Sequence, residues 1–535
     1  MAAARTQDDA PARLESLSPA TGDVLGTVPA ASPRDVEAAV AEAARVQRLW
    51  AQLRPADRAR YMARAAQAVI DEAAEIVTLA GREQGRPRAE AEMMELLSAI
   101  GTLQWLAEHG PGILAGERIG FSRSQHPIKR GRWSYEPLGV VAVLGPATEP
   151  FATPLGDVAV ALMAGNGVVL KPSPHATLSG ARIARVFARA GLPEGLLGVV
   201  QGHTDVGTAL VSSRLVAQVR FTGSTRAGRQ VGEACARGLK RSVLELGGKD
   251  AALVLADANL NRACAGIAWA AFANAGQCGA SVQRVLCVEE AFEPVLAGLV
   301  GAAQARRLGD PLDPATEIGP LVTRDRAERV QELVDEAVSS GATLHCGGRA
   351  TRPGLSGAFY APAVLTGVTS AMRITREEVP GPVVLLEAAP DEDDLVVRAN
   401  DSDAGLGASV WTGDRFKGER IARELRVGMV WMNDHLVARS APQVPWGGVR
   451  GSGIGRARGA VALRTCAEPK VVTWDPPVGT NAWWFPYDAA LARAAHAVAG
   501  LRSARDADRE RALREGTVPL AQTTRRWLRS LRRAG

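Results

Sequence analysis

Paired cysteines are missing from this chain of 535 residues. Its six cysteines are scattered, with no two at C-x-x-C spacing and none beside a histidine cluster: Cys235, Cys264, Cys278, Cys287, Cys346 and Cys466. A disulfide framework or a zinc site needs such spacings, so we expect neither, and we expect no bound metal. Unpaired thiols are typical of a reducing compartment, which favours the cytoplasm.

Long apolar runs are also missing. No stretch approaches the roughly 20 consecutive apolar residues that a membrane-spanning helix needs. The first residues, MAAARTQDDAPARLES, lack the apolar centre of a secretory signal. Both absences again favour a cytoplasmic protein, and the length predicts about three folding units.

Lysine is absent from residues 481–535, which contain eleven arginines and five acidic residues. This segment alone carries a charge of +6, equal to the net charge of the chain, so the remainder is close to neutral. We therefore expect no nucleic-acid partner for the main body. Trp527, Leu528 and Leu531 have helical spacing among the arginines, and two interpretations stay open: packing on a partner subunit, or peripheral contact with an anionic membrane surface.

Short apolar segments alternate with helical ones from about residue 138. The expected strands lie at 139–145, 167–171, 216–223, 241–248 and 251–256, and the expected helices between them at 153–164, 177–191 and 226–238. Strands without polar alternation are typical of sheets buried on both faces. The pattern predicts an α/β fold with a doubly wound, mainly parallel sheet. Amphipathic patterns at 34–52, 56–80 and 88–108 predict a mostly helical N-terminal region.

Three motifs follow one another along the chain: FTGSTRAGR (221–229), LELGGK (244–249) and FANAGQCGASVQR (272–284). The first is a glycine turn between an expected strand and an expected helix. Such a turn can hold a phosphate, because glycine allows close backbone approach and a helix N-terminus offers free N–H groups. Alone it is equally compatible with a structural turn.

Together, the three motifs resemble the NAD(P)-dependent aldehyde dehydrogenase superfamily, and the resemblance extends from about residue 20 to 475. Other stretches that match are AGNGVVLKPSP (164–174), EEVPGPV (377–383) and PWGGVRGSGIGR (445–456). The resemblance implies a Rossmann-type dinucleotide-binding domain (1–118 and 138–247), an α/β catalytic domain (248–463) and a β-hairpin oligomerisation arm (119–137 and 464–475). A basic C-terminal tail (476–535) follows. It also implies a homodimer or homotetramer and a small-molecule aldehyde as substrate.

The family's reaction uses a cysteine nucleophile and a glutamate general base, and the resemblance places the base at Glu245 of LELGGK. The nucleophile lies in G-Q-x-C, five residues before an arginine. Counting from Gln277 and counting back from Arg284 both place it at Gly279, one residue after Cys278. Neighbouring side chains point in different directions, so Cys278 is poorly placed to replace it.

A second departure concerns the oxyanion. The family's P-W-N-[FY]-P supplies an asparagine amide, whereas GPATEP (145–150) has Thr148 at that position. A lost oxyanion donor typically costs about 2.7–4 kcal/mol in the transition state. Thioester-based oxidation is therefore doubtful. The alternatives are an active oxidoreductase that uses Cys278, or direct hydride transfer with Glu245 as base.

The cofactor residues are better matched. The resemblance assigns Lys171 to the adenosine ribose, Gly223, Ser224 and Gly228 to the phosphate turn, and Glu378 to the nicotinamide ribose. Two positions depart from the family: Pro174 replaces a ribose-binding glutamate and Pro380 replaces a phenylalanine. Loss of that carboxylate would reduce repulsion of a 2′-phosphate, so the expected cofactor is NAD or NADP.

Overall fold

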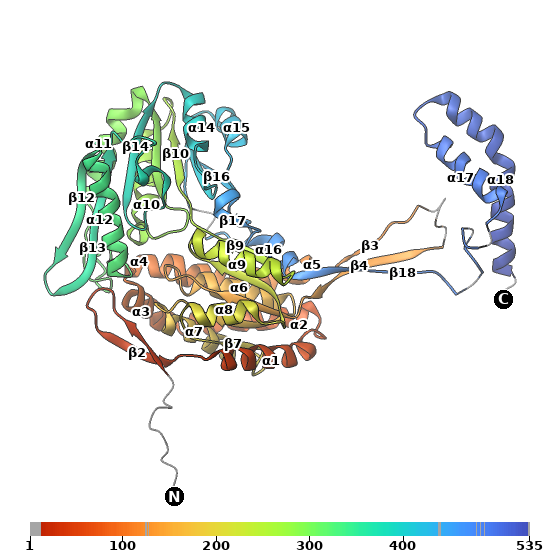
Figure 1. Cartoon of the computed structure of the whole chain (residues 1–535), viewed down its shortest axis with the longest axis horizontal. Helices are drawn as coiled ribbons and strands as arrows, with labels where there is room; N and C mark the ends of the chain where they lie inside the picture. The colour runs from red at the N-terminus through yellow and green to blue at the C-terminus, as the bar shows by residue number, and fades with distance from the viewer. Residues whose placement is uncertain are drawn as a thin grey trace, which may run out of the picture. The chain divides into compact units, whose positions relative to one another are not determined.

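The computed structural model describes residues 12–122, 126, 128–436, 440–477, 479–481, 483–485 and 487–532. They divide into a large unit, residues up to 115 with 135–468, and a small unit, residues 116–134 with 469 onwards. The α/β prediction is confirmed, because strands and helices alternate throughout the large unit (Figure 1). The assignment of domains from the sequence stays a prediction.

The N-terminal region is helical, as predicted. Its helices are α1 (Pro33–Trp50), α2 (Pro55–Asp71), α3 (Ala73–Gln84), α4 (Arg88–Glu90), the π-helical η1 (Ala91–Leu97) and α5 (Ser98–Ile113). Ser32 caps α1: its hydroxyl accepts from the Asp35 amide, and the Asp35 carboxylate accepts from the Ser32 amide. Before α1, β1 (Arg13–Leu17) and β2 (Val24–Pro29) form an antiparallel pair that the helical pattern did not indicate.

The first large sheet has six strands in the order β17-β9-β8-β5-β6-β7. Their bounds are β5 (Val140–Leu144), β6 (Gly167–Lys171), β7 (Leu197–Val199), β8 (Val216–Thr222), β9 (Arg241–Glu245) and β17 (Gly453–Ile454). All pairs are parallel except β17 with β9. The carboxyl ends of β5, β6, β8 and β9 therefore lie along one edge, where α/β sheets bind ligands.

Helices cover both faces of this sheet. Alternate residues of β5 divide between two clusters: Val140 and Ala142 pack with α1 and α8 (Thr204–Ser212), and Val141 and Val143 pack with α2, α5 and α6 (Ala152–Met163). Further helices around it are α7 (Thr177–Arg189), α9 (Thr225–Arg237) and α16 (Gly459–Thr465). Burial on both sides explains why the strand sequences are continuously apolar.

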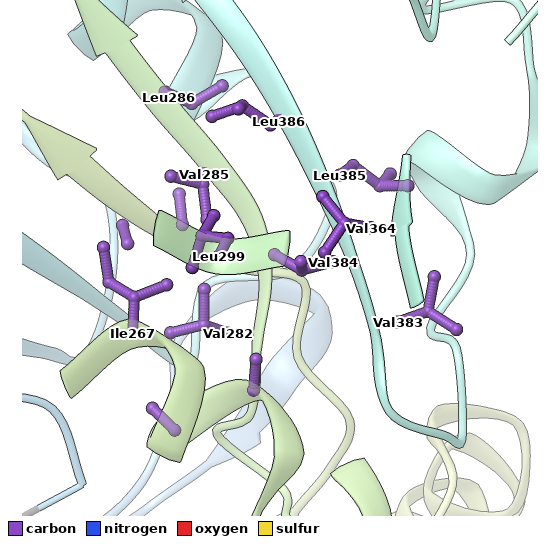
Figure 2. Packing of buried hydrophobic residues seen from close by; sticks show 14 of the residues in the cluster. Ile267, Val282, Val285, Leu286, Leu299, Val364, Val383, Val384, Leu385 and Leu386 are labelled. Carbon is purple, nitrogen blue, oxygen red and sulfur yellow. The ribbon is translucent and has the colours of Figure 1, made fainter. Parts of the chain in front are cut away.

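The second large sheet has seven strands in the order β12-β13-β14-β11-β10-β15-β16. Their bounds are β10 (Asp250–Val254), β11 (Val282–Val288), β12 (Thr343–Arg352), β13 (Leu355–Thr366), β14 (Val383–Ala389), β15 (Gly407–Trp411) and β16 (Met429–Met432). The associated helices are α10 (Leu260–Phe272), α11 (Phe292–Gln304), α12 (Arg324–Ser339), α13 (Arg373–Arg376), α14 (Glu392–Asn400) and α15 (Arg415–Glu424). Short helical turns occur at η2 (Ala273–Gly276), η3 (Glu289–Ala291) and η5 (Arg450–Ser452). Figure 2 shows β11 and β14 side chains packing with Ile267 of α10 and Leu299 of α11.

The small unit contains a three-stranded sheet and two helices. The sheet has the order β18-β4-β3, from β3 (Glu117–Arg118), β4 (Arg130–Pro137) and β18 (Ala467–Trp474). β3 and β4 pair antiparallel within the region where a hairpin arm was expected, although residues 123–125 and 127 lie outside the described chain. The helices are α17 (Ala489–Leu501) and α18 (Asp506–Arg532). Among the described residues, no helix is both long and apolar enough to span a bilayer.

We expect Leu286→Ala to destabilise the large unit strongly. Leu286 is fully buried on β11, so its loss leaves a cavity, and such truncations typically cost about 2–5 kcal/mol. Leu49→Ala is the control, because that side chain is 67% exposed and its truncation should change the free energy of unfolding by less than about 0.5 kcal/mol. Denaturant unfolding measures the free energy of unfolding of both variants. Equal losses in the two variants would contradict the burial of Leu286 in the core.

Candidate functional site

A cavity of about 440 Å³ lies in the large unit, where the loops after β5, β8 and β9 face the loop before β11. Several residues singled out from the sequence line it together: Thr148, Gly223, Ser224, Glu245, Cys278, Gly279 and Glu378. Glu149, Arg326, Pro380 and Trp446 also contribute to its wall. A volume of this size is typical of small-molecule and cofactor sites.

The glycine turn leads from β8 into α9. Ser224 is the N-cap of α9, and its hydroxyl accepts from the Ala227 amide at 3.3 Å. The Gly223 amide donates to the Glu245 carbonyl at 3.0 Å, which ties the turn to the end of β9. The turn thus brings the N-terminus of α9 to the cavity, where its free N–H groups suit a phosphate. Gly228 lies further along the helix, where an added side chain would collide with Leu246, and its role in the phosphate turn stays a prediction.

Lys171 ends β6, one strand beyond β5, and does not belong to the cavity wall. Its Nζ donates to the Pro172 carbonyl at 3.1 Å, and burial lowers its pKa to about 8 against the opposing charge of Asp205. Its placement at the carboxyl edge of the sheet is compatible with contact to an adenosine ribose, and that role stays a prediction.

Glu378 lies against the main chain of the LELGGK segment. A side chain on Gly247 would collide with the Glu378 carboxylate, so glycine is required there. Burial raises the pKa of Glu378, while Arg326 and Lys249 act in the opposite direction. A carboxylate on the cavity wall can accept hydrogen bonds from a sugar hydroxyl.

Glu245 is the last residue of β9 and is buried. Its Oε1 forms no hydrogen bond with any described residue. Burial, followed by the charge of Asp157, raises the pKa of Glu245 to about 8, with Arg220 and Arg458 opposing. A carboxyl group with this pKa is suited to proton transfer near neutral pH.

A second, narrower cavity shares Glu149, Glu245 and Trp446 with the first. Arg458 and Asp157 line its far side, and Asp157 forms a buried ion pair of 2.6 Å with Arg220. The motifs did not indicate these residues. The sequence does indicate that two of them need buried partners. Arg220 lies in the apolar strand VAQVRFTG and Asp157 in the apolar helix PLGDVAVALM, and a buried charge in such a segment requires a partner.

The loop before β11 has an unusual backbone. Asn274, Ala275 and Gly276 all have positive φ, at 54°, 52° and 72°. Left-handed backbone is costly for a residue such as alanine, so other contacts must hold it. The Glu90 carboxylate accepts from the Asn274 amide at 2.8 Å, and the Asn274 side chain donates to the Thr148 carbonyl at 3.1 Å.

Cys278 follows this loop, and its thiol is buried. The Sγ donates to the Ala273 carbonyl at 3.7 Å. Burial raises the pKa of Cys278 to about 12; Arg86 lowers it, and Glu90 and Glu95 raise it further. A thiol with this pKa is almost entirely protonated at neutral pH, and the thiolate is the nucleophilic form.

Gly279 lines the cavity and has free space in front of it. A Cβ at this position would have only the Leu406 Cδ2 within reach, at 4.0 Å, and the φ of Gly279 is not in the left-handed region. A side chain would therefore fit here without displacing its neighbours. The space lies in the same cavity as Glu245.

Thr148 sits in the loop between β5 and α6. Its carbonyl oxygen accepts from the buried Arg86 guanidinium at 2.5 Å as well as from Asn274. These bonds fix the main chain; Thr148 lines the cavity, and its side chain has a single hydroxyl.

The sequence profile described as "Aldehyde dehydrogenase family" matches residues 6–472. The chain belongs to the aldehyde dehydrogenase family. It is 35% identical over 466 residues to a betaine aldehyde dehydrogenase of Cereibacter sphaeroides, covering 87% of this chain and 94% of that protein.

Solved structures of aldehyde dehydrogenases have the same fold. The Mycobacterium tuberculosis aldehyde dehydrogenase complexed with NAD+ superposes with a TM-score of 0.82 at 34% identity, covering 87% of this chain and 95% of that one. An Escherichia coli NADP-dependent enzyme superposes with a TM-score of 0.83 at 31% identity, over 87% and 95%. The aldehyde dehydrogenase resemblance inferred from the motifs is thus confirmed for family and fold, whereas the role of each site residue stays a prediction.

We expect Gly279→Cys to fold normally and to gain one thiol that reacts with a disulfide reagent in the native state. The reason is the free space around the position, in contrast to the buried thiol of Cys278. Gly276→Cys is the control: it has a φ of 72° and would collide with the Gly381 carbonyl, so its melting temperature should fall. Thiol titration that finds no additional reactive group in Gly279→Cys would show that Gly279 does not face the cavity.

The pKa of Glu245 predicts a pH-dependent stability difference from Glu245→Gln. Between pH 4.5, the ordinary pKa, and pH 8, the folded state holds a proton that the unfolded state has released. The glutamate therefore loses stability relative to glutamine as pH rises through this window, by roughly 1.4 kcal/mol per pH unit. Denaturant unfolding of both proteins at several pH values measures the difference, and one that stays constant would contradict the raised pKa.

Proposed function

We propose that this aldehyde dehydrogenase family member binds NAD or NADP but does not oxidise aldehydes through a cysteine thioester. The observation that carries the proposal is the arrangement of residues 278 and 279. Gly279, which lines the same cavity as Glu245, has no side chain, and the neighbouring thiol is buried with a pKa of about 12. Loss of an essential nucleophile typically lowers kcat by about 10⁶.

Several features support cofactor binding. The glycine turn, the N-terminus of α9 and Glu378 meet at one cavity, with Lys171 on the adjoining strand end. A bound nicotinamide dinucleotide would supply a hydride acceptor. Its phosphates would meet Gly223 and Ser224, and Glu378 would hold a ribose. Because Pro174 offers no carboxylate to repel a 2′-phosphate, both NAD and NADP suit the chain.

Thr148 supports the same conclusion about the chemistry. An oxyanion formed at this site would find one hydroxyl on a short, branched side chain in place of a side-chain amide. Arg86 and Asn274 hold the Thr148 carbonyl and not its hydroxyl, so they do not orient the donor. Weak oxyanion stabilisation and a missing thiol affect the same chemical step.

The second candidate is an active oxidoreductase that works without a covalent intermediate. The space at Gly279 would hold the hydroxyl of a hydrated small-molecule aldehyde near Glu245, and Glu245 would take the hydroxyl proton as the C–H hydrogen departs as hydride. The product is a carboxylic acid. With a pKa of about 8, Glu245 would act as a base more effectively as pH rises through 8. Use of Cys278 would instead require a local change of the backbone.

We also propose a homodimer or homotetramer in the cytoplasm. The sheet of β18, β4 and β3 supports assembly, because β18 exposes Val471, Val472 and Trp474. The C-terminal tail is proposed to make a peripheral contact with an anionic membrane surface.

Turnover assays on the wild type, Cys278→Ala, Glu245→Gln and Gly279→Cys test the chemistry. With a broad set of aldehydes and either NAD or NADP, we expect no thioester-type turnover in the wild type, a change of protein fluorescence on adding cofactor, and at best weak activity in Gly279→Cys because Thr148 remains. Wild-type turnover abolished by Cys278→Ala would overturn the proposal.

Two further outcomes separate the candidates. Turnover that survives Cys278→Ala, rises through pH 8 and disappears in Glu245→Gln would establish the noncovalent oxidoreductase. No fluorescence change and no protection from thermal unfolding by either dinucleotide would remove the cofactor proposal itself.

A further inference from the structure

The C-terminal part of the small unit lies outside the aldehyde dehydrogenase match, which ends at residue 472. Here α17 and α18 pack side by side (Figure 1). Their contact is built from small residues: Gly516 lies against Ala497, and Gly500 against Ala512. This face of α18 therefore packs against α17, and the opposite face does not take part in that contact.

Four exposed arginines follow α18 on the side away from Ala512: Arg511, Arg514, Arg525 and Arg529, of which Arg511 also borders the hollow between α17 and α18. At 100° per residue they fall within about 60° of one another, centred more than 120° from Ala512, and they extend over about 27 Å of helix. None of them forms an ion pair with a described residue, whereas Arg505, Arg509 and Arg526 all do. We call these four residues the arginine face.

Exposed apolar side chains lie on the same half of α18. Val518 lies among the arginines and is 64% exposed, and Leu528 flanks them on one side. Leu528 is also substantially exposed. This half of α18 therefore exposes both cationic and apolar side chains, so one partner could contact both kinds of group.

The segment that contains Trp483, Trp484, Phe485 and Tyr487, which we call the aromatic segment, lies beside the last turns of α18. Asp488 accepts from Arg526 at 2.7 Å, and the Thr480 amide donates to the Ser530 hydroxyl at 3.0 Å, which fixes both ends of the segment. Its aromatic residues are largely exposed, with Phe485 at 81% and Tyr487 at 66%, together with Trp483 and Trp484. Exposed aromatic clusters of this kind mark contact sites.

We propose that the arginine face and the aromatic segment bind the surface of a bilayer that contains anionic phospholipid. Guanidinium groups pair with lipid phosphates, and tryptophan and tyrosine favour the depth of the headgroups. A nucleic acid could use the arginines, but it would gain nothing from Val518 and Leu528, whereas a bilayer accepts both kinds of group. This inference rests on the tail contact proposed above and is independent of the chemistry at Glu245.

Sedimentation of the full-length protein with phosphatidylcholine vesicles, with and without phosphatidylglycerol, tests it. We expect binding only to the anionic vesicles, and weakening when NaCl rises from about 0.1 M to about 1 M, which shortens the Debye length from about 10 to about 3 Å. Each arginine near such a surface contributes about fivefold in affinity, so R511Q/R514Q/R525Q/R529Q should bind roughly 600-fold more weakly.

A matched control removes four exposed, unpaired arginines from the large unit: R34Q/R48Q/R214Q/R349Q. It has the same net charge as the arginine-face variant and should bind like the wild type. A second variant, Trp484→Ser with Phe485→Ser, should bind more weakly without any change in net charge. Circular dichroism checks that the helices persist in each variant.

Three results would overturn the proposal: equal binding to neutral and anionic vesicles, an equal loss in the matched control, or retention on single-stranded RNA without vesicle binding. Because the readout is vesicle binding, it stays separate from the turnover assays. Cofactor binding without vesicle binding would reject this inference alone, and vesicle binding without cofactor binding would reject only the proposal for the cavity.

Discussion

The hydrogen bonds of Asn274 determine which residue reaches the cavity. Its amide is held by Glu90 at the end of α4, and its side chain is held by the loop after β5, so two distant segments fix one left-handed turn. From this turn the chain runs into β11 in a single register, with Cys278 directed into buried surroundings and Gly279 beside open space. A backbone change that exposed Cys278 would have to break these bonds. The proposals about the chemistry all depend on this constraint.

Buried charge is the second determinant of the site. Glu245 lies near the Asp157–Arg220 pair and Arg458, and burial outweighs both cations in raising its pKa. The charge of Asp157 adds to the effect of burial, while Arg220 and Arg458 oppose it. A general base is thereby kept mostly protonated at neutral pH, which ties any reaction that needs its carboxylate to alkaline conditions.

The sequence predicted much of the fold, because the apolar strands and their intervening helices are long and regular. The motifs that resemble the family also indicated several residues that line the cavity, whereas Lys171 and Gly228 lie outside its wall. The pair β1–β2 was not foreseen because its two short strands have no apolar alternation, with exposed and half-buried residues throughout β2. The Asp157–Arg220 contact joins residues 63 positions apart, and each residue signals only that it needs some partner. Three consecutive positive φ angles, two of them on Asn274 and Ala275, follow from contacts with distant segments and cannot be inferred from NAGQCG.

The cost of burying Glu245 supports retained binding at the cavity. Glu245 lines the cavity and is buried with its pKa raised to about 8, and its Oε1 has no hydrogen-bond partner among the described residues. Such a group lowers stability relative to an apolar side chain of similar size. A protein that used this fold only as a scaffold would be more stable without it. A group that reduces stability and lines a cavity is typical of a site that recognises a ligand. Under the proposal, the absence of a side chain at Gly279 removes the covalent step of the family's reaction, while the glycine turn and Glu245 remain available for binding.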